Sequence, residues 1–495
     1  MLLMWAAASA GETISYQASV TANGATEGFA PYMLGSWNSG RVYVGKGIWQ
    51  DGAFHRDIDL NRRFSWAYGA EYIAGIGTGV SYRRWSPQLN DFTLSTVRQA
   101  NIRLIQAYGT LKYRQAYLIL GMKDRESRMV DGELSAGDYV RSNNARPIPG
   151  VAAGFIDFVD IPFTNGWVQI DGEIMYGKFF DNGERIGANN HYTGTMDVDL
   201  YYHYKRCLFR TKPSKPFSVT VGMTTATLFG GTQYTYRGGK ITNVDSRGLK
   251  FKDIFDVMIP NEGSGENYYK GQTLGAWDLK AVYRFRNSSR LTFYVQKPWE
   301  DGSGVGFRTG WDGIWGLQYD MAKESYLSKV LIEYIDFTNC SGPMHFAPSD
   351  NINTTLKGHT NGADNYYNNS FYGPYVNYGM AIGTPFMLAP VYNRDGIYQF
   401  KQTKTRGFHL AATGRITHNW KWRAMVSYQK AAGTPFVSTW KKLHNTSAMV
   451  EATWYPTAHW TARAQVALDS GDLRGDNFGG AVSVAYHGDF TIGKK

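Results

Sequence analysis

Long hydrophobic runs are missing from this chain of 495 residues. No stretch of about 18 or more apolar residues occurs, so the sequence excludes a membrane-spanning helix. The mean hydropathy of −0.38 is also low for a helical membrane protein. Low hydropathy does not exclude a membrane barrel, because a barrel places its apolar residues at every second position of each strand.

Cysteine and dense basic runs are scarce as well. The two cysteines, Cys207 and Cys340, are weak grounds for a disulfide, and two isolated thiols are the simpler interpretation. The net charge is +11, but lysine and arginine are interleaved with acidic residues in strands and loops. This distribution argues against nucleic acid as a partner and leaves an anionic membrane surface or an acidic polymer.

Catalytic and cofactor-binding signatures are also missing. The ten histidines are scattered, and no local spacing places a nucleophile beside a base. Gly-Gly-Lys at 238–240 lacks the spacing of a phosphate-binding loop. The Asn- and Asp-rich segment 348–369 has no EF-hand spacing, and a solvated loop is the simpler interpretation. We therefore expect no enzymatic activity, no catalytic residue, no bound metal and no cofactor.

What the chain does have is alternation with a period of two. In 277–286, one parity carries aromatic and aliphatic residues, while the other carries Asp278, Lys280, Arg284 and Arg286. Successive side chains of a strand point to opposite faces, so one face is apolar and the other charged. The same pattern recurs in four further segments, which are 167–176, 420–429, 460–469 and 480–490.

A sheet closed on itself fits this pattern better than a soluble sheet. Almost every strand has the same two faces, and no helix remains to cover the apolar one. Each run has about 10 residues, the length that a tilted strand needs to cross a bilayer. We therefore predict an all-β fold, a transmembrane antiparallel β-barrel of about 18 strands (18–20), apolar outside, polar inside and with long extracellular loops.

The connections support this fold because short and long ones alternate along the chain. The short connections are 164–166, 211–215, 286–289, 322–326, 417–419 and 456–459. The long connections are 123–150, 180–195, 229–273, 298–310, 339–375, 431–444 and 470–479. The alternation breaks near 385–406. An additional strand at about 396–403 would restore it, with 385–395 as an inner turn and 404–405 as an outer one.

The first ten residues, MLLMWAAASA, resemble the apolar region and small-residue cleavage site of a secretory signal peptide. We expect cleavage after Ala10 and a single barrel domain over residues 11–495, since no linker or internal repeat is evident. An export signal followed by a barrel predicts a multi-pass protein in the outer membrane of a Gram-negative bacterium.

The loop 123–150 carries a first set of polar side chains suited to binding a sugar. Asn143, Asn144 and Arg146 lie close together, and Pro147 and Pro149 stiffen the approach to the next strand. A structural role is equally open, because the same side chains could pin the loop inside the lumen.

Further candidates lie in three other external loops. Trp299 and Trp311 flank one of them and could stack on a sugar ring, although tryptophan at strand ends is usually part of an interfacial girdle. The charged cluster in 469–479 could bind polysaccharide, although tight turns and ion pairs also explain it. The full set of candidate polysaccharide-binding residues is Asn143, Asn144, Arg146, Trp299, Asp301, Trp311, Asp364, Asn365, Asp472, Arg474, Asp476 and Asn477.

Several of these segments resemble the Wzi family of capsule-assembly outer-membrane proteins. They are DLNRRFSWAYGAEY (59–72), SNNARPIPGVAAGFIDFVDIPF (142–163) and DSGDLRGDNFG (469–479), and ADNYYNNSFY (363–372) is similar to the branch without a large helical periplasmic part. The resemblance implies an 18-stranded barrel whose lumen is occluded by infolded loops. It also implies a lectin that holds exported capsular or extracellular polysaccharide on the cell surface and catalyses no reaction.

The chain departs from this family in two respects. It has no amphipathic helical stretch that could form the N-terminal bundle of the best-known members. It also continues to Lys495 beyond Phe490, whereas outer-membrane strands usually finish on an aromatic residue that the assembly machinery reads. The expected partners are capsular or extracellular polysaccharide, outer-membrane lipids including lipopolysaccharide, and that assembly machinery.

Two functions remain open from the sequence. The first is retention of polysaccharide, which the polar outer loops and the basic balance favour. The second is an outer-membrane porin or selective transport channel. Inward charges such as Asp171, Glu173 and Arg423 favour a channel, since a barrel of this size has room for an aqueous path.

Overall fold

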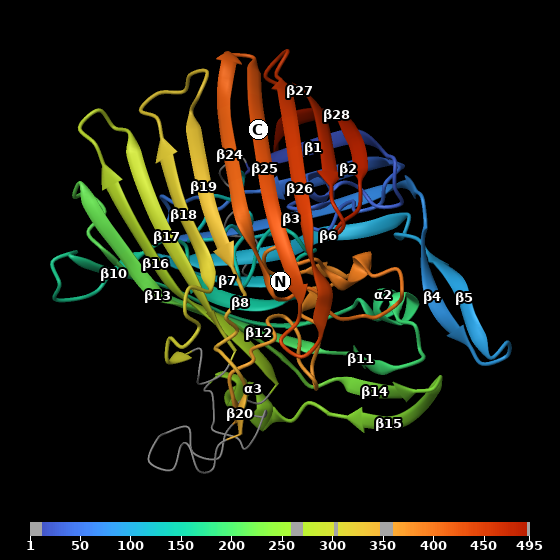
Figure 1. Ribbon diagram of the computed structural model, residues 1–495. Coiled ribbons are helices and arrows are strands. Elements are labelled where there is room, and N and C mark those ends of the chain that lie inside the picture. The colour runs from blue at the N-terminus through green and yellow to red at the C-terminus, as the bar shows by residue number, and fades with distance from the viewer. Residues whose placement is uncertain (1–11, 259–270, 301–304, 347–359, 493–495) are drawn as a thin grey trace.

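A computed structural model describes residues 12–258, 271–300, 305–346 and 360–492 of the chain. The predicted cleavage after Ala10 and the candidate residue Asp301 lie outside these residues. One large antiparallel sheet dominates the molecule, and its strands incline around a common axis (Figure 1). Its strand segments are β1 (Glu12–Ala25), β2 (Gly47–Arg56), β3 (Phe64–Gly77), β6 (Ile102–Tyr113), β7 (Ala116–Met122), β8 (Gly150–Phe155), β9 (Val159–Asp160), β10 (Val168–Lys178), β12 (Tyr201–Thr211), β13 (Phe217–Phe229), β16 (Gln272–Arg284), β17 (Arg290–Trp299), β18 (Gly313–Asp320), β19 (Lys329–Asp336), β24 (Thr405–Thr417), β25 (Trp420–Gly433), β26 (Ser438–Trp454), β27 (Trp460–Ser470) and β28 (Asn477–Ile492).

The sheet closes into a barrel of 18 strands. The short segments β8 and β9 both pair with β10, so they are two parts of one strand. The first strand, β1, pairs with the last, β28, along its whole length, from Glu12 opposite Ile492 to Ala25 opposite Gly479. The predicted closed antiparallel barrel is therefore confirmed.

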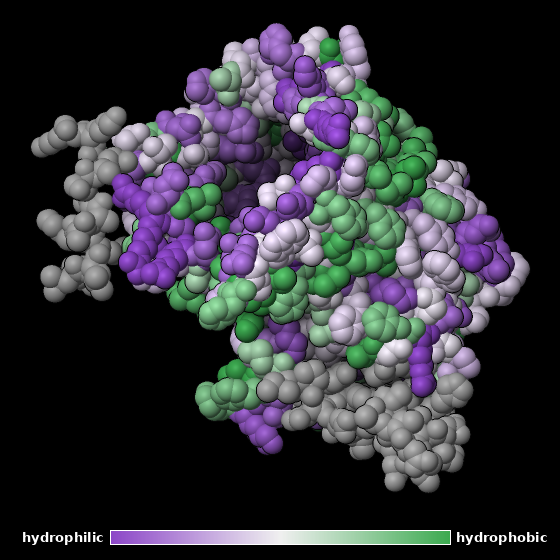
Figure 2. Space-filling view, turned by 90° about the vertical axis from the view of Figure 1, so that its left-hand side faces the viewer, coloured by the Kyte–Doolittle hydropathy of each residue, from purple (hydrophilic) through white to green (hydrophobic). Residues whose placement is uncertain are grey.

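Side chains on each strand alternate between an apolar outer face and a more polar inner face. On β24, Phe408 and Leu410 point outward and are 51% and 46% exposed, whereas His409 and Ala411 point inward and are buried. Figure 2 shows the result on the surface, where hydrophobic side chains cover much of the outer wall and hydrophilic ones line a hollow at one end. This is the distribution that a bilayer requires of a barrel.

Short turns lie at one end of the barrel, the turn end, which also holds Glu12 and Ile492. Long connections lie at the other, the loop end (Figure 1). Every predicted short connection is found at the turn end. One predicted long connection, 431–444, is wrong, because β25 and β26 continue and leave only 434–437 between them.

The additional strand predicted at 396–403 is also wrong. β19 pairs directly with β24, so 337–404 is one connection, and 385–395 and 404–405 are not barrel turns. Tyr398 and Phe400 are 4% and 1% exposed within the barrel interior. The alternation of this segment reflects packing inside the lumen, which gives the same local pattern as a strand in the wall.

The middle of the lumen is filled by three infolded segments, which we term the plug: 26–46, 123–149 and 360–404. The second segment crosses the lumen and bonds to the inner wall. Its Ala136 N–H donates to the Glu333 carboxylate at 2.7 Å, and its Tyr139 N–H donates to the Gln296 side chain at 3.1 Å. The core of the molecule thus lies between plug and wall.

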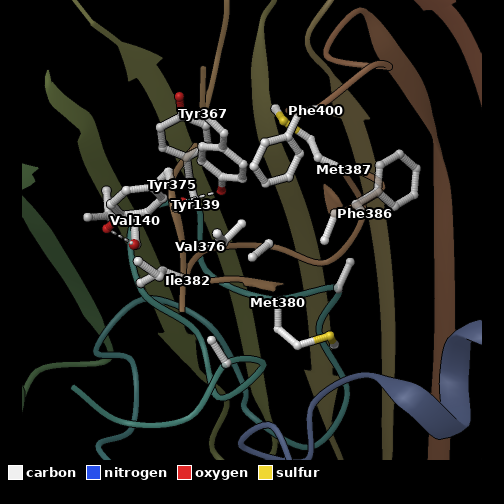
Figure 3. Close-up of a cluster of buried hydrophobic side chains, with 14 of the residues drawn as sticks. Tyr139, Val140, Tyr367, Tyr375, Val376, Met380, Ile382, Phe386, Met387 and Phe400 are labelled. Atoms are coloured by element: carbon white, nitrogen blue, oxygen red, sulfur yellow. Dashed lines mark hydrogen bonds between the residues drawn. The ribbon is translucent and has the colours of Figure 1, made fainter. Parts of the chain in front are cut away.

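Aromatic side chains join the second and third plug segments to each other (Figure 3). The Tyr375 hydroxyl donates to the Val140 carbonyl at 2.7 Å, and the Tyr367 hydroxyl donates to the Tyr139 carbonyl. Tyr139 and Tyr367 stack with their ring centroids 5.2 Å apart. All four side chains are fully buried.

Shorter elements belong to the plug or to the external loops. Within the described residues, no helix has both the length and the apolar character needed to cross a membrane. Small β-hairpins and helices project beside the barrel at the loop end (Figure 1). The shorter elements of the plug are α1 (Tyr32–Gly35), β21 (Thr360–Asn361), β22 (Val376–Asn377), β23 (Met380–Ala381) and the 3₁₀ helix η1 (Pro390–Tyr392). Those of the other long connections are β4 (Val80–Ser86), β5 (Asp91–Val97), α2 (Asn182–Ala188), β11 (Gly194–Val198), β14 (Thr232–Arg237), β15 (Lys240–Ser246), α3 (Phe251–Met258) and β20 (His345–Phe346).

Candidate functional site

The candidate residues of the motif 142–150 connect the plug segments. Asn144 is fully buried, and its side-chain amide bonds to the backbone of the two other plug segments at 2.9 and 3.3 Å. Arg146 is also buried, and its guanidinium lies 3.6 Å from the ring centre of Tyr378. Asn143 lines an inner pocket of about 360 Å³. These contacts support the structural role left open by the sequence, and sugar binding by these residues stays a prediction.

The two candidate tryptophans lie in different environments. Trp299 ends β17 and is 2% exposed, so it packs inside the molecule. Trp311 is 71% exposed, and its ring centroid lies 5.3 Å from that of Trp315 on the outer wall. This is the position of an interfacial aromatic side chain. The structure therefore does not bring the two tryptophans into one site.

Three candidates of the last long connection line a cleft of about 320 Å³ at the rim of the loop end. The Arg474 guanidinium lies 3.9 Å from the ring centre of Tyr32 and donates to backbone carbonyls of the third plug segment. The Asn477 amide donates to the Phe29 carbonyl at 3.0 Å. Asp476 accepts hydrogen bonds from residues 470 and 471. These side chains are engaged mainly in holding the rim.

Asp472 lies outside this cleft and forms an exposed ion pair. Its carboxylate accepts from Lys441 Nζ at 2.7 Å and from the His444 N–H at 2.7 Å. The hydrogen bond from Lys441 is the main cause that lowers the pKa of Asp472 to about 2. The ion pair links the last long connection to β26.

We expect Lys441→Ala to raise the pKa of Asp472 from about 2 toward the ordinary value of 3.8. A lowered carboxyl pKa stabilises the folded loop above pH 3.8, and this contribution is lost as the pH falls toward 2. An NMR titration of the Asp472 carboxyl carbon in detergent measures the change. Lys442→Ala is the matched control, and equal pKa values in both variants would contradict the assignment.

The last two candidates, Asp364 and Asn365, lie on the wall of a larger pocket at the loop end, which we term the mouth pocket. Its volume is about 490 Å³, within the range of small-molecule sites. The start of β16, residues 362–370 and 397–402 of the plug, and the start of β26 form its wall. Segments far apart in the sequence thus converge on one site.

Internal hydrogen bonds hold the polar wall of the mouth pocket in place. The Ser341 hydroxyl donates to the Asp364 carboxylate at 2.6 Å, and the Thr403 hydroxyl donates to the Asn365 side-chain oxygen at 2.7 Å. The Asn368 side chain bonds the Phe400 carbonyl at 2.7 Å and the Phe400 N–H at 2.9 Å, further along the same plug segment. The shape of the pocket is therefore set before a ligand arrives.

The sequence analysis did not identify two polar side chains of this wall, Gln272 and Thr439. Gln272 is 2% exposed, and neither atom of its amide has a hydrogen-bond partner among the described residues. The Thr439 hydroxyl is likewise unpaired there. A buried polar group without a partner costs about 1–3 kcal/mol. Strand parity in the sequence could have shown that Gln272 points inward, but not that 362–370 and 434–439 meet it.

An aromatic ring completes the mouth pocket. Phe436, on the connection between β25 and β26, is 57% exposed and lies on the pocket wall. An exposed ring beside amides and hydroxyls can pack against an apolar face of a ligand while the polar groups bond its hydroxyls.

Across 12–258, 271–300, 305–346 and 360–492, no group of three His, Cys, Asp or Glu side chains is placed to hold a metal ion.

Comparison with solved structures supports the architecture, whereas comparisons of sequence find no relative. No model of a protein family matches the chain, and no curated protein matches it in sequence. Among solved structures, it is similar to Wzi of Escherichia coli, an outer membrane protein involved in group 1 capsule assembly and described as a carbohydrate-binding β-barrel. The identity is 12%, the match covers 94% of this chain and 83% of that chain, and the TM-score is 0.56.

Two further structures align over most of their length. OccK5 of Pseudomonas aeruginosa is 8% identical, with 97% of this chain and 98% of that chain covered and a TM-score of 0.45. OccAB2 of Acinetobacter baumannii is 9% identical, with the same coverage and a TM-score of 0.49. These two structures carry no argument. The likeness to Wzi, at 12% identity, shows the fold alone, which is that of an outer-membrane β-barrel.

Proposed function

We propose that this protein resides in the outer membrane and retains capsular or extracellular polysaccharide at the cell surface. The mouth pocket is the single observation that carries this proposal. It is a preformed pocket with polar and apolar side chains on its wall. It lies at the loop end, which in an outer-membrane barrel faces the outside of the cell. A plugged lumen below it is suited to holding a polymer in place rather than passing it through.

The wall of the pocket offers the contacts that a sugar ring requires. The Gln272 amide, with a donor and an acceptor, and the Thr439 hydroxyl lie on this wall. Neighbouring atoms cover them in the free protein, so a sugar would reach them after a small shift of these neighbours. Phe436 provides an apolar face. Hydroxyl groups of a sugar unit would pair the buried amide and remove the penalty of leaving it unpaired. The same proposal includes that this protein is a member of the Wzi family and acts as a lectin.

The positive net charge of the protein adds a long-range attraction to the binding of an acidic polysaccharide. The net charge of +11 attracts an acidic polysaccharide before any contact forms in the pocket. Such attraction between exposed charges is screened as the ionic strength rises. Binding of an acidic capsule should therefore weaken with salt, while the contacts inside the pocket persist.

We expect Gln272→Leu to weaken binding of surface polysaccharide by about tenfold, which corresponds to about 1.4 kcal/mol. The same substitution should leave the thermal stability of the free protein unchanged or slightly higher, because it removes an unpaired buried amide. Purified protein in detergent is screened against glycans of the host cell surface, and affinities are measured by calorimetry. The matched control is Gln465→Leu on the inner wall of β27, away from the pocket.

Equal affinity of Gln272→Leu and the native protein, or no binding to any surface glycan, would contradict this function.

The second candidate function, a transport channel, has one observation in its favour. A hydrophilic hollow opens at the turn end of the barrel (Figure 2). Steady ion conductance through the native protein in a planar bilayer would favour the channel.

A further inference from the structure

One part of the outer wall departs from the apolar pattern. On β10, β12 and β13, most outward side chains in the half nearer the loop end are polar. His203 and Lys205 point outward, because Tyr204 between them faces the plug and stacks with Arg141. The remaining polar side chains of this outer patch are Tyr176, Thr225 and Thr227.

The register places this polar patch within the height of the apolar belt. Lys205 lies directly opposite Ile174 on β10 and Thr225 on β13. Ile174 points outward and is 41% exposed, so the wall beside Lys205 presents an aliphatic side chain at the same level. An unpaired lysine facing lipid at this depth would cost several kcal/mol.

Helix α3 covers the patch. The Lys205 ammonium donates to the carbonyls of Val257 at 3.2 Å and Met258 at 2.5 Å, at the C-terminus of the helix. The Tyr176 hydroxyl donates to the Ile254 carbonyl at 2.7 Å. A cation at a helix C-terminus also meets the negative end of the helix dipole. The polar wall groups thus hold the helix against the outside of the barrel.

The other face of α3 is aromatic and points away from the wall. Phe251 and Phe255, one helical turn apart, are 77% and 58% exposed, and their ring centroids lie 5.4 Å apart. Asp253 and Val257 form the buried face of the helix. Two adjacent exposed phenylalanines in water would be unfavourable, whereas a helix with one apolar face is stable at the surface of a bilayer.

We propose that α3 is a lipid-embedded helix that completes the apolar belt of the barrel, with Phe251 and Phe255 in contact with acyl chains of the outer leaflet. The helix replaces the polar outer faces of β12 and β13 by an aromatic surface, on a wall where Ile174 of β10 and Val221 of β13 are also exposed. The belt is therefore built partly from an external loop. This inference depends on the barrel spanning a membrane and not on polysaccharide binding.

The test is lipid quenching of a fluorophore at residue 255. The native Cys207 points outward on β12 and is exposed, whereas Cys340 is buried, so a thiol probe labels position 207 alone. Labelled native protein gives the lipid-facing reference. Phe255→Cys in a Cys207→Ser background gives the test position, and Lys240→Cys in the same background gives a water-facing reference on the exposed tip of β15.

Each protein is labelled with NBD and reconstituted into vesicles containing doxyl-labelled lipids. We expect the probe at 255 to be quenched to a similar extent as the probe at 207, and several-fold more than the probe at 240. Quenching no greater than at 240 would overturn the proposal. So would a probe at 255 that is shielded from both lipid and aqueous iodide, because protein rather than lipid would then cover the helix. Phe251→Cys repeats the measurement on the same face should Phe255→Cys fail to assemble into a heat-resistant barrel.

Discussion

Replacing residues 125–146 by a short glycine–serine loop should turn a silent barrel into a conducting pore. These residues belong to the second plug segment, which bonds to Glu333 and Gln296 on the inner wall. A barrel of this strand number leaves an aqueous channel once its lumen is emptied. Gly121 and Gly150 are paired neighbours at the ends of β7 and β8, so a loop of about four to six residues can join the strands without straining them.

Single-channel recording in planar bilayers measures this change. We expect no steady current through the native protein and resolved conductance steps through the replacement variant. The control replaces 233–245, most of the β14–β15 hairpin outside the lumen, by the same linker, and no current is expected through it. Heat-dependent migration on gels verifies that both variants keep the barrel. A variant that is silent although its barrel is intact would show that the two other plug segments suffice to close the lumen.

Tyr367→Ala should loosen the plug without opening the barrel wall. The Tyr367 ring packs against Tyr139 and Phe400 with centroid distances of 5.2 and 5.3 Å, and its hydroxyl accepts from the Thr384 N–H at 3.0 Å. Loss of a buried aromatic side chain costs about 3–5 kcal/mol. Because the barrel strands keep their own hydrogen bonds, we expect this loss to appear as local opening of the plug.

Hydrogen–deuterium exchange resolves this effect by segment. Amides of the plug segments around 139 and 367 should exchange faster by about two orders of magnitude or more, while those of β24 to β28 stay protected. Tyr326→Ala, at a 73% exposed position of a short turn, is the control and should change exchange little. Unchanged exchange of the plug in Tyr367→Ala would contradict the role assigned to this ring.

The barrel wall was predictable because its signal is local. A side chain two positions away points to the same face, so alternation within ten residues identifies a strand and its lipid-facing side. The segments 460–469 and 480–490 correspond to β27 and β28 for this reason. The alternation of short and long connections similarly predicted the two ends of the barrel.

The contents of the lumen were not predictable in this way. The segment 396–403 alternates like a strand, yet Phe400 is buried in the plug through contacts with Asn368 and Tyr367. Nothing local distinguishes an apolar residue that faces lipid from one that faces a plug. The motif 142–150 showed which side chains are polar, but not that Asn144 would bond to the two other plug segments.

By itself, the sequence determined a closed wall with an apolar outside. Each strand must present apolar side chains to lipid on one face and more polar side chains to the interior on the other. Only the tertiary structure decided how the long connections are used. It brought Gln272 of β16 beside Asn365 and Phe436, and it laid α3 over Lys205. These contacts join residues that are tens to more than a hundred positions apart, and such convergence depends on the packed loops rather than on any local pattern.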